Sequence, residues 1–140
     1  MVRFTKIKYS ELNSKQKEIF NFQKVSGVLA DYGYATLRLS DDWNGADFLA
    51  VHRDGTTTLR VQLKSRLNFQ TKYQRKDLWM CFRNKGRVFL FPHDKVLAQL
   101  LNRIENTVSW DNGGYSWGNP PQWAEALLER YMLGYEAEAP

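Results

Sequence analysis

The chain has 140 residues, of which 43% are hydrophobic and 25% charged, and its formal net charge is +5. This size and composition predict one globular domain over residues 1–140 whose core needs no disulfide or metal. A single cysteine, Cys81, excludes an internal disulfide, and two histidines exclude a zinc cluster. The apolar runs are shorter than the ~20 residues of a membrane span, and the first residues lack a signal-peptide core, so we expect a cytoplasmic protein with no membrane partner.

The first predicted element is a helix from Asn13 to Tyr32. Asn13 and Gln16 form a capping box, and Gly33 is a natural stop. One apolar stripe runs along this helix: Phe22, Val25, Leu29 and Tyr32. Because successive residues rotate by about 100°, Glu18 falls in line with that stripe, where a carboxylate costs free energy unless it is paired or binds a ligand. Pairing with a neighbouring basic side chain is an equal alternative for Glu18.

A first strand over residues 34–39 (YATLRL) and a loop over residues 40–45 (SDDWNG) are predicted next. Asp41 and Asp42 carry oxygens that can bind a metal, but paired Asp residues in a turn usually bond the local backbone. We therefore expect both to lie outside any site.

The next segment predicts a β-hairpin. Residues 46–53 and 56–66 are apolar-rich, β-branched runs, and Asp54 and Gly55 between them are a strong signal for a two-residue type I′ turn. A turn at these two residues fixes the register of the hairpin. The numbers of any two directly opposed residues then add up to the same total, so every cross-strand neighbour is known.

The register places Asp47 opposite Gln62 and Gly45 opposite Lys64. Side chains alternate along a strand, so Asp47, Gln62 and Lys64 share one face of the hairpin. The other face is apolar: Phe48, Ala50, Leu59, Val61 and Leu63. Directly opposed Cβ atoms lie about 4.5–5.5 Å apart, and residues two apart on a strand roughly 6.6 Å, which suits one divalent ion and one activated water.

These residues resemble the PD-(D/E)xK nuclease superfamily, whose signature is an acid on one strand and an acid-x-Lys triplet on the next. Asp47 matches the first acid, and Gln62-Leu63-Lys64 matches the triplet. The chain departs from the pattern at Ala46, where the family often has Pro, and at Gln62, which resembles a variant of some homing and restriction endonucleases. The resemblance extends over roughly the first two thirds of the chain.

The resemblance implies an α/β fold with a restriction-endonuclease-like core, in which helices flank a central mixed sheet of αβββαβ type. The core would span about residues 10–104, and an aromatic extension with a further hairpin and helix would span about residues 105–135.

The resemblance also implies an endonuclease-like hydrolase that cleaves DNA with Mg²⁺ or Mn²⁺. The implied metal ligands are Asp47, Gln62, the Leu63 carbonyl and Glu18, and Lys64 would orient the attacking water. Gln23 is the alternative to Glu18, because its distance from Gly33 is closer to that in related families. An amide oxygen brings no charge, so Gln62 predicts weaker metal binding than a carboxylate would give.

After the triplet, residues 65–77 are polar and predict a loop or short helix. Two apolar runs, residues 78–82 and 87–91, predict strands joined by a turn at residues 83–86. Cys81 lies in the first run, and we expect it to be a buried small hydrophobe rather than a nucleophile.

Asp94 is placed to cap a helix from Lys95 to about Arg103. Its predicted buried face comprises Val96, Leu97, Leu100, Leu101 and Ile104. Residues 110–117 (WDNGGYSW) form a Gly-centred hairpin candidate, and residues 122–133 a last helix. The final EAEAP is expected to be disordered.

Basic side chains are concentrated in the middle of the chain. Between Arg60 and Arg87 there are nine Lys or Arg and one acid, whereas from Glu105 to the end six acids face Arg130 alone. This distribution predicts a nucleic-acid partner, with DNA preferred, along the central stretch. The expected phosphate contacts are Arg66, Lys72, Arg75 and Lys76.

Two other functions fit the sequence. Gln62 favours a catalytically weak or inactive module of the same fold that binds DNA or RNA. The aromatic and acidic C-terminal third favours a protein-interaction domain or a homodimer interface over direct contact with DNA.

Overall fold

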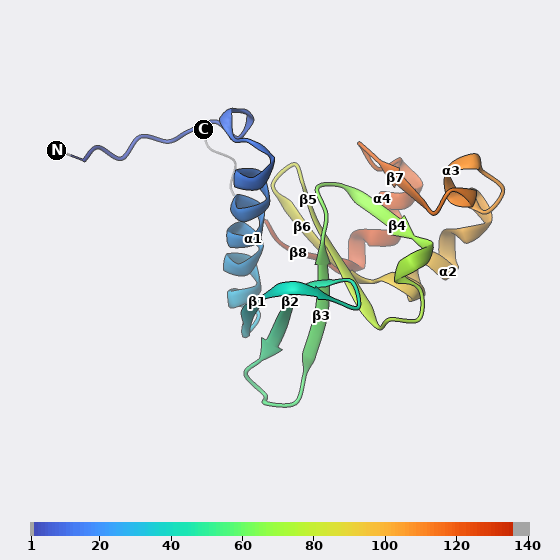
Figure 1. The fold of residues 1–140 in the computed structure, drawn as a ribbon, viewed down its shortest axis with the longest axis horizontal. Coiled ribbons are helices and arrows are strands. Elements are labelled where there is room, and N and C mark those ends of the chain that lie inside the picture. The colour runs from blue at the N-terminus through green and yellow to red at the C-terminus, as the bar shows by residue number, and fades with distance from the viewer. Residues whose placement is uncertain (1, 136–140) are drawn as a thin grey trace.

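The computed structural model of the chain describes residues 2–135, except for the side chains of residues 42, 43 and 135. The segment EAEAP, for which the sequence predicts disorder, lies outside the described residues. The protein is an α/β fold built on an open mixed sheet of six strands in the order β1-β2-β3-β5-β6-β8. Helix α1 covers one side of this sheet, and the other helices and a two-stranded ribbon lie on the other side (Figure 1).

The strands of the large sheet are β1 (Tyr34–Trp43), β2 (Ala46–His52), β3 (Thr58–Leu63), β5 (Leu78–Asn84), β6 (Arg87–Pro92) and β8 (Met132–Tyr135). The ribbon consists of β4 (Leu67–Gln70) and β7 (Gly114–Trp117). The helices are α1 (Ser14–Asp31), α2 (His93–Ile104), α3 (Val108–Asp111) and α4 (Gln122–Leu128), with 3₁₀ turns η1 (Tyr9–Glu11), η2 (Thr71–Tyr73) and η3 (Glu129–Tyr131).

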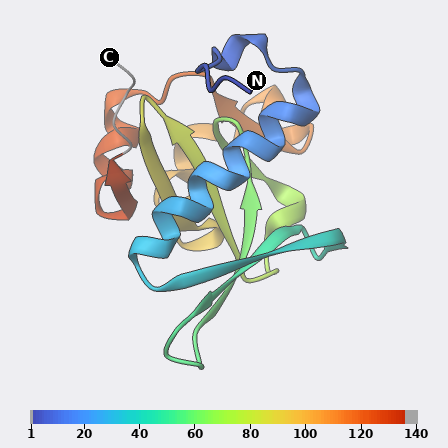
Figure 2. The same ribbon diagram turned by 90° about the vertical axis from the view of Figure 1, so that its left-hand side faces the viewer.

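The predicted first helix is confirmed. Asn13 is the N-cap, and the capping box is complete: the Asn13 side chain accepts the Gln16 N–H at 2.9 Å, and the Gln16 side chain accepts the Asn13 N–H at 3.0 Å. Val25 and Leu29 are buried against the sheet, but Tyr32, predicted to continue the stripe, is 45% exposed because the helix ends there. Figure 2 shows α1 lying diagonally across the sheet.

The predicted β2–β3 register is confirmed, with Phe48 opposite Val61 and Ala50 opposite Leu59. The predicted type I′ turn is wrong, because φ is positive at Gly55 (77°) but not at Asp54. The Asp54 carboxylate instead accepts the backbone N–H groups of Thr56 and Thr57, both at 2.8 Å, and this bonding shapes a loop of residues 53–56. The observed four-residue loop and the predicted two-residue turn have the same midpoint, so the same residues stay opposite each other. Each side chain therefore remains on its predicted face of the sheet.

A type I′ turn does occur one hairpin earlier. The predicted loop at residues 40–45 is wrong: β1 continues to Trp43, and Asn44 and Gly45 turn the chain with φ of 53° and 91°. A Cβ on Gly45 would lie 2.7 Å from Leu78 Cδ1 and 3.2 Å from Tyr73 Cδ1, so this turn packs tightly against the segment that follows β3.

That segment crosses between the two parallel strands, β3 and β5. A loop or short helix is predicted over residues 65–77, and the αβββαβ order expects a helix before the next strand; the crossover instead contains β4 and the 3₁₀ turn η2. Leu67 and Phe69 alternate with polar residues and are both buried, which is the pattern of a half-buried strand. The basic residues around them mask this short pattern in the sequence.

The β5–β6 hairpin confirms the two predicted strands on either side of residues 83–86. Lys85 and Gly86 form its turn with positive φ, and both strands are buried on both sides of the sheet. Burial raises the pKa of the Cys81 thiol to about 12, although Arg83 opposes the shift, so Cys81 is an unreactive core residue as expected.

Helix α2 begins two residues earlier than predicted, with Pro92 as its N-cap. Asp94 therefore does not cap it; its Oδ2 accepts the backbone N–H of Arg75 at 2.8 Å and so fixes the crossover. The predicted buried face is confirmed for Val96, Leu97, Leu100 and Ile104, whereas Leu101 is partly buried.

The C-terminal third differs most from expectation. The predicted hairpin at residues 110–117 is instead helix α3 followed by β7, which pairs with β4 far back in the chain. The last helix ends at Leu128, and β8 then joins the edge of the large sheet beside β6. The aromatic residues of this third pack against the core: Trp110, Tyr115, Trp117, Trp123 and Tyr131. Within residues 2–135, no helix is both long and apolar enough to cross a membrane.

His93 is fully buried where β4 meets α2. Its Nδ1 lies 2.8 Å from Asp94 Oδ1, and its Nε2 accepts the Gln70 N–H at 3.2 Å. Neutral imidazole satisfies both contacts, with Nδ1–H donating to Asp94 and Nε2 accepting. Burial lowers the pKa of His93 below its usual value, although the hydrogen bond and charge of Asp94 oppose the shift.

We expect the free energy of unfolding to decrease as the pH falls below about 6.5, the pKa of histidine in an unfolded chain. Below that pH the unfolded chain binds a proton at His93 that the folded chain excludes. This contribution to stability is therefore complete above about 6.5 and is lost progressively as the pH falls. Urea unfolding at pH 7.5 and 5.5 measures the effect. His93→Gln removes this titration and leaves the Gln70 N–H poorly satisfied, at a cost of about 1–3 kcal/mol at pH 7.5. An equal pH dependence in wild type and variant would contradict the assignment.

Candidate functional site

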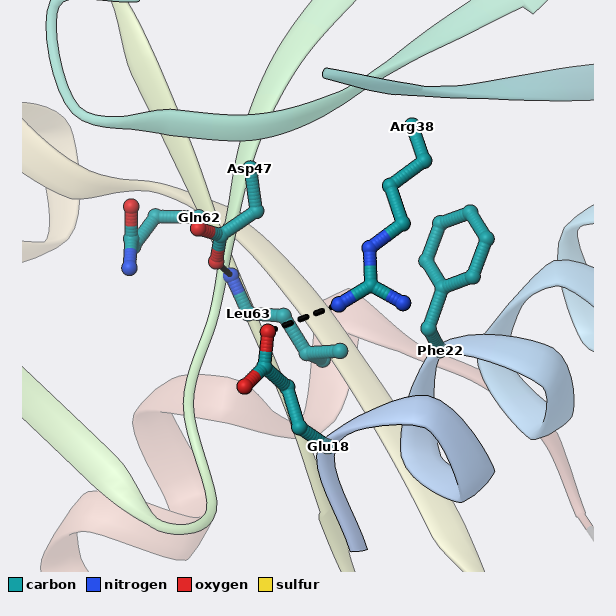
Figure 3. Close-up of a pocket in the computed structure, with 6 residues that line it drawn as sticks. All are labelled: Glu18, Phe22, Arg38, Asp47, Gln62 and Leu63. Atoms are coloured by element: carbon teal, nitrogen blue, oxygen red, sulfur yellow. Dashed lines mark hydrogen bonds and ion pairs between the residues drawn. The ribbon is translucent and has the colours of Figure 1, made fainter. Parts of the chain in front are cut away.

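The candidate site lies where β2 and β3 separate. Their last paired residues are Phe48 and Val61, so the predicted pairing of Asp47 with Gln62 lies just beyond the ladder. Asp47 Oδ2 accepts the backbone N–H of Leu63 at 2.8 Å, in place of a main-chain carbonyl from β2 (Figure 3). The carboxylate is therefore fixed against β3 at the start of the Gln62-Leu63-Lys64 triplet.

Two cavities meet at Asp47. The smaller, of about 290 Å³, is lined by Glu18 and Phe22 from α1, Arg38 from β1, and Asp47, Gln62 and Leu63 (Figure 3). The larger, of about 630 Å³, shares four of these residues and adds eight, among them Lys64, Lys72, Tyr73 and Asp41. One cavity therefore brings together Asp47, Gln62, Lys64 and Glu18, which the sequence singles out from three different elements.

Glu18 borders both cavities but does not face inward as predicted. Its side chain is 55% exposed, and its Oε1 lies 2.7 Å from Arg38 Nη2 and 3.9 Å from Lys15 Nζ. Glu18 therefore forms the ion pair with a basic neighbour that was its alternative prediction, and it still borders the candidate site. The alternative residue, Gln23, is exposed and borders neither cavity.

Arg38 is a site residue that sequence reasoning missed. Its side chain is 35% exposed, and its guanidinium lies 5.4 Å from the centre of the Phe22 ring as well as against Glu18. Strand alternation could have indicated it, because Thr36 lies on the same side of β1 and its hydroxyl donates to Ser26 Oγ of α1 at 2.8 Å. Arg38 therefore places a permanent positive charge in contact with Glu18, one of the two carboxylates of the smaller cavity.

Two ammonium groups lie near the Tyr73 ring in the larger cavity. Lys64 Nζ lies 5.6 Å and Lys72 Nζ 5.4 Å from the ring centre, within the range of cation–π attraction. The Lys64 backbone N–H donates to the Cys81 carbonyl at 2.9 Å, which continues the β3–β5 pairing one residue beyond the strand. The sheet therefore fixes the Lys64 backbone, and Tyr73, which sequence reasoning also missed, positions its side chain.

The other predicted phosphate contacts are not at this site. Of Arg66, Lys72, Arg75 and Lys76, Lys72 lines the larger cavity, whereas the other three line neither cavity. Asp41, which was expected to lie outside the site, borders the larger cavity because β1 continues past it.

The donors at this site are oxygens: the carboxylates of Asp47 and Glu18 and the Gln62 amide. In Figure 3 the Gln62 amide points away from Glu18, so these donors are spread around Asp47. Among the described residues, no three His, Cys, Asp or Glu side chains gather closely enough to hold a metal ion. The oxygen chemistry suits Mg²⁺, which proteins often hold with one or two carboxylates while substrate phosphates complete the shell.

No family model matches the sequence, and no curated protein is similar to it. The assignment of this site therefore depends on its geometry and chemistry.

Proposed function

We propose that this protein is a metal-dependent phosphodiesterase that hydrolyses nucleic acid, with DNA as the first substrate to test. The observation that supports this function is the 630 Å³ cavity, where Asp47, Gln62 and Lys64 stand beside Glu18. A carboxylate, an amide oxygen and an ammonium around one opening are suited to a divalent cation, a phosphate and a water.

We further propose a restriction-endonuclease-like core formed by α1 and strands β1, β2, β3 and β5. The features that support it are the leading helix, the antiparallel β1–β2–β3 meander and the parallel β3–β5 pair. A strand and a 3₁₀ turn replace the expected helix in the crossover, so this core would be a variant of the αβββαβ order.

Asp47 and Gln62, with the Leu63 carbonyl and Glu18, would hold Mg²⁺ or Mn²⁺, which when bound supplies Lewis-acid activation of the scissile phosphate. Glu18 can join only if it exchanges the Arg38 guanidinium for the ion. Lys64 orients the attacking water, and its ammonium stabilises the negative charge of the pentacoordinate phosphate, while the proton of the water passes to solvent. Lys72 binds a neighbouring phosphate, and Arg66, Arg75 and Lys76 would contact the chain farther from the cavity.

One alternative has a specific observation in its favour. Among the described residues, no three potential metal ligands of the His, Cys, Asp or Glu type lie together, and Arg38 already neutralises Glu18. Both features are expected for a module that binds nucleic acid without cutting it. An assay with supercoiled plasmid, linear duplex and single strands, each with and without Mn²⁺, separates the two functions. Cleavage that requires Mn²⁺ supports the enzyme, and binding without cleavage of any substrate supports the module.

Replacing Gln62 by Glu should strengthen the site. The change adds a second negative charge beside Asp47, so we expect the Kd for Mg²⁺ to fall about tenfold and cleavage at low Mg²⁺ to rise. Isothermal titration calorimetry measures the affinity. Gln74→Glu, which adds the same charge at an exposed residue outside both cavities, is the matched control. If both variants bind Mg²⁺ equally, Gln62 does not hold the ion.

A further inference from the structure

A third cavity, of about 450 Å³, lies along the β4–β7 ribbon. The ribbon pairs Asn68 with Ser116 and Gln70 with Gly114, while Leu67 and Phe69 point the other way into the core. The polar side of the ribbon and the end of α3 form a groove on the side of the large sheet away from α1 (Figure 1). We call this cavity the ribbon groove; the residues used below are Asn68, Gln70, Lys72, Asn112, Tyr115 and Ser116.

The ribbon groove is polar but nearly uncharged. Among the described residues that line it, Lys72 is the one charged residue, and the others are Asn, Gln, Ser, Thr, Gly and Tyr115. This neutrality differs from its surroundings, because the C-terminal third of the chain is acidic and the crossover is basic. A ligand that fits such a lining is neutral, planar or compact, and rich in hydrogen-bond donors and acceptors.

Lys72 connects the ribbon groove to the candidate active site, because its side chain lines both cavities. A nucleic-acid strand with one phosphate beside Lys64 would meet Lys72 at a neighbouring phosphate and then reach the amides of the groove. Asn and Gln side chains match base edges, since each amide has an NH₂ donor group beside a carbonyl acceptor. Gln70 Nε2 donates to Asn68 Oδ1 at 2.9 Å, which holds these two amides side by side. Tyr115 pairs with Phe69 and packs toward the core with its ring 4.7 Å from that of Trp117, so these aromatic residues support the ribbon from the side opposite the amides.

We propose that the ribbon groove binds an unpaired base of the nucleic acid, on the Lys72 side of the reactive phosphate. A paired base is stacked within a duplex and its Watson–Crick edge is occupied by its partner, so the groove would admit a base that lies outside a duplex. The inference rests on the proposed function for its substrate class. It adds a base-binding subsite and a preference for single-stranded segments.

The test measures binding without catalysis. The probes are fluorescent 12-nucleotide single strands of DNA and RNA, with a matched abasic DNA strand that keeps the phosphates, all in EDTA at one salt concentration. We expect the wild-type protein to bind the strands with bases about tenfold more tightly than the abasic strand. The variant Asn68→Ala/Asn112→Ala should lose that difference and keep its affinity for the abasic strand. Lys72→Ala should weaken both to a similar extent.

Asn106→Ala, which removes an exposed amide outside the groove, is the control, and thermal melts establish that each variant is folded. Equal wild-type binding to normal and abasic strands, or no binding to either, would overturn the ribbon groove as a base site even if the double variant failed to fold. Base-dependent binding without Mn²⁺-dependent cleavage would support the groove and reject the enzyme. Cleavage with equal binding of normal and abasic strands would reject the groove alone.

Discussion

Replacing Lys64 by alanine is expected to lower the cleavage rate by about 10²–10⁴-fold while leaving affinity for nucleic acid nearly unchanged. Lys64 Nζ is positioned over Tyr73 in the cavity that contains Asp47, so its loss removes the cation that we propose orients the water. Lys72 remains, with its Nζ 5.4 Å from the centre of the same ring, and would still contact phosphate. Single-turnover cleavage in Mn²⁺ and fluorescence anisotropy in EDTA measure the two effects separately.

Lys85→Ala is the matched control, because Lys85 is an exposed lysine in the β5–β6 turn and lines none of the three cavities. It should cleave like wild type. A Lys64→Ala protein that cleaves at the rate of this control would remove Lys64 from the mechanism. An equal loss of binding and cleavage would make Lys64 a phosphate anchor instead.

Replacing Asp47 by Asn is expected to abolish both the heat of Mg²⁺ binding and cleavage, with the fold retained. The amide oxygen of Asn can still accept the Leu63 N–H, which Asp47 Oδ2 accepts at 2.8 Å, but the negative charge that holds the ion is lost. Asp47→Ala loses the acceptor as well, so we expect a further decrease of about 1 kcal/mol in the free energy of unfolding. Titration calorimetry and urea unfolding measure the two effects.

Asp31→Asn removes one exposed carboxylate at the end of α1 and serves as the charge control for the titration. Mg²⁺ heat that persists in Asp47→Asn at the level of this control would show that the ion binds elsewhere. The protein would then be better described as the binding module.

The core of the candidate site was predictable because local patterns determine it. The alternation of Phe48, Ala50, Leu59 and Val61 fixes which face of the β2–β3 hairpin is apolar, and burial of that face sets the register even though the turn differs from prediction. The positions of Asp47, Gln62 and Lys64 relative to one another follow from this register. Their distance from Glu18 does not, because it depends on how α1 packs on the sheet.

The missed elements depend on contacts between distant parts of the chain. Strand β4 has four residues, and its partner β7 lies more than forty residues later, so no local period indicates the pair. A Cβ on Gly114 would lie 2.9 Å from the Phe69 carbonyl oxygen, which explains why β7 needs glycine there. The sequence shows the glycines and aromatic residues of this segment but not the strand that they approach.

The Arg38–Glu18 ion pair has a consequence for the folding of the protein. Carboxylates that together bind a divalent ion usually repel one another in the absence of that ion. A protein whose stability depends on such a site unfolds when a chelator removes the metal. Here a guanidinium already supplies counter-charge to Glu18 from within the chain, so the charge of this carboxylate is balanced without a metal ion. We therefore expect the architecture of this pocket not to depend on whether the proposed ion is bound.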